Sequence, residues 1–174
     1  LCNLNVASTV ADKLEQYRPD NIVVDPVMIS TSGSKLLDDE AIDLIVKRIF
    51  PLSTIITPNK SEAKVLTGET DPDRQAKILM GMGCRNVLLK GGDSDRKDFK
   101  IDYLYLENKH TGIELRADAV NTVNTHGTGC TLSSAIASYL ALGYDSEQAV
   151  RAAKFYISRA LEAGAFVTTG RGHG

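Results

Sequence analysis

The segment 124–130 (NTHGTGC) places two glycines directly before a stretch of small residues that is typical of a packed helix. Glycines let the backbone turn tightly and approach a ligand closely. The first amides of a helix have no partner within it, and the helix dipole adds partial positive charge at that end. Such an end binds anions, and a migrating phosphoryl group gains most from it. The sequence therefore predicts a phosphate cradle at Gly127, Thr128, Gly129 and Cys130.

The same spacing also has a purely structural interpretation. A Gly-Thr-Gly turn can begin an ordinary packed helix in which Cys130 is a small core residue. Spacing alone leaves both interpretations open. If the cradle exists, Cys130 lies in the first helical turn with its side chain directed at the same spot.

Three short apolar stretches, residues 22–24, 54–57 and 86–90, predict buried strands of a parallel sheet. Ligands of such sheets bind beyond the carboxyl ends of the strands, so polar residues there are candidates for a site. Asp25 follows the first stretch, and Lys90 closes the third. A turn cap for Asp25 and a solvated side chain for Lys90 are the structural alternatives.

The helical periods between and after these strands predict an α/β fold with helices on both faces of the sheet. Helices are expected over 5–17 (with Val6, Val10, Leu14 and Tyr17 on one face), 37–49, a short stretch ending near Gly68, 72–82, 128–142 and 145–163. Residues 101–106 and 112–118 alternate between apolar and polar side chains and predict an antiparallel hairpin at the sheet edge. Asn59 and Glu62 have the spacing of a helix-capping box.

The composition is that of one ordinary globular domain over residues 1–174, with 43% apolar and 24% charged residues and a net charge of −2. This balance predicts neither a nucleic-acid nor a membrane partner. The three cysteines have no paired spacing, so we expect a reducing, cytoplasmic compartment, with Cys2 and Cys84 in the core. A dehydrogenase-type dinucleotide domain is excluded, since no Gly-x-Gly-x-x-Gly follows the first strand.

Four motifs, in order and with fitting spacing, resemble the hydroxymethylpyrimidine/phosphomethylpyrimidine kinases of the ribokinase superfamily. They are DPVM (25–28) with TSG (31–33), TPN (57–59) with Glu62 and Ala63, KGG (90–92), and GTGC (127–130) followed by TLSSA. The resemblance covers the chain from about Asn21 to Gly164. Most superfamily members have Asp at the position of Cys130, whereas cysteine there resembles the pyrimidine kinases and a group of pyridoxal kinases.

The resemblance implies a ribokinase-like three-layer α/β/α fold with a mostly parallel sheet. It also implies ATP-dependent phosphorylation of 4-amino-5-hydroxymethyl-2-methylpyrimidine and its monophosphate, as in thiamine biosynthesis. Cys130 stands where the superfamily's Asp is the general base, so it would either accept the proton or only line the site.

The resemblance also assigns the nucleotide and metal contacts. Lys90, Gly91 and Gly92, with Asn59 nearby, would bind the ATP phosphates. Glu62 and Asp25 would lie at Mg²⁺, largely through water. This assignment fits the chemistry of Mg²⁺, which keeps several waters and needs few carboxylates.

The acceptor stays open. In the family, the pyrimidine-binding residues lie largely in an N-terminal portion with a lid, and we expect this portion to be absent before Leu1. Two alternatives therefore remain: a cysteine-type pyridoxal kinase, and a truncated, non-catalytic module that binds nucleotide or phosphate. Homodimers are frequent in the family, although the sequence gives no independent indication of one.

Overall fold

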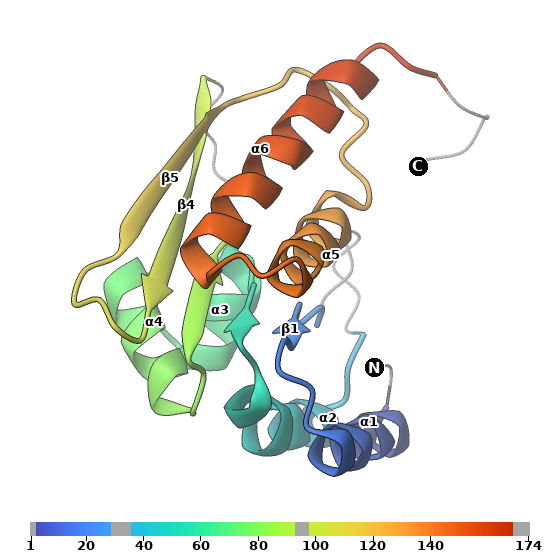
Figure 1. The fold of residues 1–174 in the computed structure, drawn as a ribbon, viewed down its shortest axis with the longest axis vertical. Helices are drawn as coiled ribbons and strands as arrows, with labels where there is room; N and C mark the ends of the chain where they lie inside the picture. Colours follow the sequence, from blue (N-terminus) through green and yellow to red (C-terminus); the bar gives the residue numbers. More distant parts are fainter. Residues whose placement is uncertain (1–2, 29–35, 93–97, 169–174) are drawn as a thin grey trace.

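Five strands form one central sheet in the computed structural model, which describes residues 3–28, 36–92 and 98–168 (Figure 1). The strands are β1 (Val23–Val24), β2 (Ile55–Ile56), β3 (Asn86–Leu89), β4 (Phe99–Leu106) and β5 (Ile113–Asp118), and they are neighbours in that order. The first three pair in parallel, and β3–β4 and β4–β5 pair antiparallel. The predicted parallel part and the hairpin at the edge are both confirmed.

Helices cover both faces of this sheet (Figure 1). On one face lie α1 (Leu4–Tyr17), α2 (Asp39–Leu44), α3 (Lys60–Thr67) and α4 (Pro72–Gly81). On the other face lie α5 (Thr128–Ala141) and α6 (Ser146–Gly164). The three-layer α/β/α fold is therefore confirmed.

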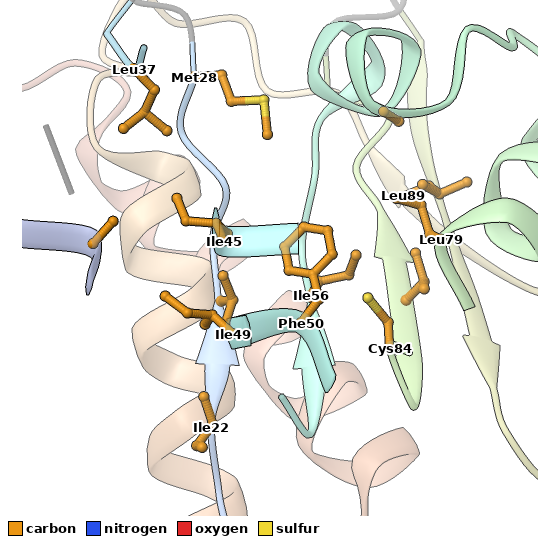
Figure 2. Close-up of a cluster of buried hydrophobic side chains, with 14 of the residues drawn as sticks. Ile22, Met28, Leu37, Ile45, Ile49, Phe50, Ile56, Leu79, Cys84 and Leu89 are labelled. Atoms are coloured by element: carbon orange, nitrogen blue, oxygen red, sulfur yellow. The ribbon is translucent and has the colours of Figure 1, made fainter. Parts of the chain in front are cut away.

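Alternation of side chains along the buried strands supplies two separate cores. Ile56, Val87 and Leu89 point into the core beneath α1–α4, part of which is drawn in Figure 2. Ile55 and Leu88 point into the core beneath α5 and α6. This arrangement explains why the strands read as continuous apolar runs, since each residue is buried on one face or the other.

Two helices differ in detail from the prediction. In α1 the buried residues are Ala7 and Ala11, whereas Val6 and Tyr17 are exposed, because the small alanines allow close packing. The helix expected over 37–49 is α-helical only at Asp39–Leu44, which is α2. It continues as a π turn at Ile45–Ile49 and a 3₁₀ turn at Phe50–Leu52. Pro51 lies at the start of this last turn, where a missing N–H donor is tolerated.

The cysteine at position 84 is buried as predicted, and burial raises the pKa of its thiol to about 12. Cys2 and the TSG motif at 31–33 lie outside the described residues. Within the ranges that the structure describes, none of the helices has both the length and the apolar character to cross a membrane.

Candidate active site

The carboxyl ends of the three parallel strands meet around an ion pair between Lys90 and Asp25. The Lys90 N–H donates to the Pro58 carbonyl at 2.9 Å, and Lys90 forms a parallel bridge with Asn59. Its Nζ lies 2.6 Å from Asp25 Oδ1, which also accepts a hydrogen bond from Thr57 Oγ1 at 3.0 Å. The Lys90 and Asp25 side chains are only 14% and 11% exposed. The structure thus joins two residues that the sequence placed at separate strand ends.

The first turn of α5 lies directly beside this ion pair. A Cβ atom on Gly129 would lie 3.3 Å from Lys90 Nζ and 3.7 Å from Asp25 Oδ2. Glycine therefore leaves the helix backbone open toward both charges. This proximity places the predicted phosphate cradle next to the strand ends that carry Lys90 and Asp25.

The start of α5 offers fewer free backbone amides than predicted. Gly127 turns the chain into α5 with φ 78°, a left-handed conformation that favours glycine. The Thr128 N–H already donates to the Thr125 carbonyl, at 3.3 Å. In the described part of the chain, the amides of Gly129 and Cys130 donate to no protein group. These two amides, with an exposed Cys130 thiol beside them, remain available to an anion.

Glu62 lies in the wall of the same site, where it caps α3. Its Oε2 accepts the Asn59 N–H at 2.7 Å, and Asn59 Oδ1 accepts the Glu62 N–H at 2.9 Å. The predicted capping box is therefore confirmed. Glu62 is only 2% exposed, and burial raises its pKa above the ordinary value, while the nearby Lys90 charge opposes this rise. Its role at Mg²⁺ remains a prediction.

Glu62→Gln tests this burial through the pH dependence of stability. Because the pKa of Glu62 is higher in the folded chain than in the unfolded chain, its contribution to stability is fully present below about pH 4.5 and is lost as pH rises through the folded pKa. Glutamine keeps an acceptor for the Asn59 amide and does not titrate. We expect urea unfolding to show the variant gaining stability relative to the wild-type chain from about pH 4.5 to about pH 8. A difference that is the same at both pH values would contradict the raised pKa.

The glycines after Lys90 differ from each other. A Cβ on Gly91 would lie 1.7 Å from the Ile101 carbonyl oxygen of β4, whereas one on Gly92 would meet no atom within 4 Å. The Gly91 N–H donates to Asp102 Oδ1 at 2.8 Å. Gly91 is therefore required by close packing of the chain on itself. Its predicted contact with nucleotide, and that of Gly92, remain predictions.

Three residues that shape the site, Thr57, Asp102 and Lys154, had no predicted role. Thr57 bonds to Asp25, and Asp102 bonds to Gly91 and to Lys154 of α6. Thr57 is a polar residue at the end of a buried strand, and this position could have identified it as a site residue. No local pattern could have joined Asp102 to Lys154, which are 52 residues apart.

A separate hollow between α4 and the β4–β5 hairpin contains none of the predicted site residues. Its lining includes Asp73, Lys77, Tyr105 and Glu114. Among the described residues, no three His, Cys, Asp or Glu side chains gather as a metal site. The candidate site for phosphate chemistry therefore stays at the strand ends and the start of α5.

Comparison with known proteins agrees with the resemblance. The phosphomethylpyrimidine kinase family model matches residues 1–174. The hydroxymethylpyrimidine/phosphomethylpyrimidine kinase of Helicobacter pylori is 38% identical over 181 residues, covering 100% of this chain and 66% of the relative. The thiamine biosynthesis bifunctional protein of Geobacter sulfurreducens is 41% identical over 173 residues, covering 95% of this chain and 34% of the relative. The chain thus spans about two thirds or less of the length of these relatives.

Solved structures show the same fold. A crystal structure of phosphomethylpyrimidine kinase from Clostridium difficile has a TM-score of 0.73 and 37% identity, covering 91% of this chain and 67% of that one. A pyridoxal kinase of Bacillus subtilis, solved as an ADP complex, has a TM-score of 0.80 and 30% identity, covering 91% and 61%. The family model spans the whole sequence, so this chain belongs to the phosphomethylpyrimidine kinase family.

Proposed function

We propose that this chain carries the phosphoryl-transfer part of an ATP-dependent kinase for a hydroxymethylpyrimidine and its monophosphate. The proposal rests on the closeness of the start of α5 to the Lys90–Asp25 pair, because a Cβ atom added to Gly129 would lie 3.3 Å from Lys90 Nζ. Names of relatives that match most of the chain support the same reaction. An amine and free amides facing one space suit a phosphoryl group that is passed between two oxygens.

The residues at this space fit both ATP phosphates and Mg²⁺. Lys90 offers a cation at the end of β3, and its pairing with Asp25 holds the amine in place before phosphate arrives. Asp25 offers hard carboxylate oxygens of the kind that Mg²⁺ prefers, and Glu62 stands close by. When bound, Mg²⁺ would neutralise charge on the β- and γ-phosphates.

The chain's own groups then divide the work. The amides of Gly129 and Cys130 would donate to the oxygens of the migrating group, and the α5 dipole would favour its negative charge. Lys90 would hold the adjacent phosphates. The Cys130 thiol would face the acceptor hydroxyl, where it can take the proton or exclude water.

Lys90→Met should weaken binding of a non-hydrolysable ATP analogue about 10- to 100-fold, because a charge-assisted contact to phosphate is lost. Isothermal titration calorimetry measures this affinity. Lys64→Met is the matched control, since Lys64 is an exposed lysine in the last turn of α3. Equal affinity in the Lys90 and Lys64 variants would contradict a phosphate role for Lys90.

A kinase assay of the full gene product with ATP and Mg²⁺ identifies the acceptor. The substrates compared are the pyrimidine alcohol, its monophosphate and pyridoxal. We expect turnover of both pyrimidines and little of pyridoxal. The close fold match to a pyridoxal kinase keeps that activity as the second candidate, which preferential turnover of pyridoxal would establish. Binding of nucleotide without turnover of any acceptor would identify a non-catalytic module. A homodimer and a cytoplasmic location remain predictions.

A further inference from the structure

We infer that Asp102 and Lys154 are positioning residues for Lys90, acting through the Gly91 backbone. This inference rests on the proposed function, because it matters only if Lys90 binds a ligand. Neither residue belongs to the motifs that carry the family resemblance, and in the described structure neither forms a hydrogen bond or ion pair with the Lys90 side chain. Their effect would reach the site through two bonds in series.

The first bond fixes the backbone just after Lys90. The Gly91 N–H leaves the strand ladder and donates to Asp102 Oδ1 at 2.8 Å. The preceding N–H, that of Lys90, donates to the Pro58 carbonyl at 2.9 Å on the opposite side. The peptide unit that carries Lys90 is therefore held from β4 on one side and from the end of β2 on the other.

The second bond fixes the Asp102 carboxylate. Asp102 Oδ2 accepts from Lys154 Nζ at 2.5 Å, so its two oxygens serve two different partners. The side chains are 12% exposed for Lys154 and 10% for Asp102. At this burial, removal of the cation would leave the carboxylate oxygen without its partner, and the geometry of the carboxylate would change. Lys154 thus holds Asp102 in the orientation in which its other oxygen accepts the Gly91 N–H.

The backbone of Gly91 is also held in place by close packing against β4. Because Gly91 has no Cβ, its backbone packs directly against the Ile101 carbonyl. Asp102 follows Ile101 in β4, so a movement of Asp102 would also shift the peptide between Lys90 and Gly91. Lys90 Nζ reaches Asp25 Oδ1 at 2.6 Å, and a small shift of its backbone would change where the amine meets phosphate. A role in folding alone would leave the affinity of the folded protein for nucleotide unchanged.

The test compares variants of this chain by calorimetric binding of a non-hydrolysable ATP analogue, at a temperature where each is folded by circular dichroism. Lys154→Met removes the cation. The double variant Asp102→Asn/Lys154→Met leaves no stranded buried charge and keeps a neutral acceptor for Gly91, so it stays informative if the single variant unfolds. Arg151→Met is the control, since Arg151 forms an exposed ion pair with Glu147 one turn earlier on α6.

We expect about tenfold weaker binding in both Lys154 variants and unchanged binding in Arg151→Met. In a Lys90→Met background, the same Lys154 changes should have little further effect, because the residue that they position is gone. Unchanged affinity in a folded Lys154 variant, or an equal loss with and without Lys90, would overturn the inference while leaving the kinase proposal intact. Absence of analogue binding by the wild-type chain would instead defeat the proposed function, and this inference with it.

Discussion

Replacing Cys130 with alanine is expected to lower turnover about 100-fold or more, while affinity for an ATP analogue changes less than about threefold. The backbone amide of residue 130 survives the change, so the cradle for phosphate stays intact. Only the exposed thiol is lost. The full gene product, assayed with the pyrimidine alcohol under saturating ATP, gives turnover, and calorimetry gives affinity.

Two companion variants sharpen this test. Cys130→Asp introduces the residue that most of the superfamily has there, and it should recover part of the turnover if residue 130 accepts the proton. The turnover of Cys130→Ser should stay close to that of the alanine variant, because a serine hydroxyl is a much weaker base than an aspartate carboxylate at neutral pH. Equal losses of turnover and affinity in the alanine variant, or no loss of either, would refute a role for this thiol in the reaction.

Gly91→Ala should destabilise the fold by about 3 kcal/mol or more. The added Cβ would lie 1.7 Å from the Ile101 carbonyl oxygen. The Cβ is fixed to the backbone of residue 91 and the oxygen belongs to the backbone of β4, so neither can move aside without distorting the chain. Urea unfolding monitored by circular dichroism measures the loss.

Gly92→Ala is the matched control for this change. A Cβ at Gly92 meets no atom within 4 Å, so its effect on stability should stay within about 0.5 kcal/mol. Similar losses in the two variants would show that the glycines serve the flexibility of the loop, and that close packing against Ile101 does not decide the stability.

Much of the fold could be predicted because local patterns and tertiary packing agree. Ile55 and Ile56 read as a buried strand, and they point into different cores. The capping box at Asn59 and Glu62 is a local interaction that spacing identifies well. The packed face of α1 was harder to predict, because Ala7 and Ala11 contribute little hydrophobicity and yet allow the closest approach.

The residues of the site could be predicted one by one, but the long-range hydrogen bonds between them could not. Strand ends and a helix start can be found from the sequence, but their meeting depends on long-range pairing. The Lys90–Asp25 bond spans 65 residues, and only the folded sheet brings the two together. The bond between Thr128 and Thr125 depends on how the turn closes, which composition does not encode. The predicted ligand contact of Gly91 remains a prediction, and the structure adds the close packing of its backbone on Ile101.

The proposed reaction places the migrating phosphoryl group at the start of α5. A crystal structure of this chain with ADP, Mg²⁺ and aluminium fluoride, a mimic of that group, shows where the group binds. We expect fluorides about 3 Å from the amide nitrogens of Gly129 and Cys130, with Lys90 Nζ on the adjacent phosphate. A mimic bound away from these amides, with Lys90 still paired only to Asp25, would contradict it.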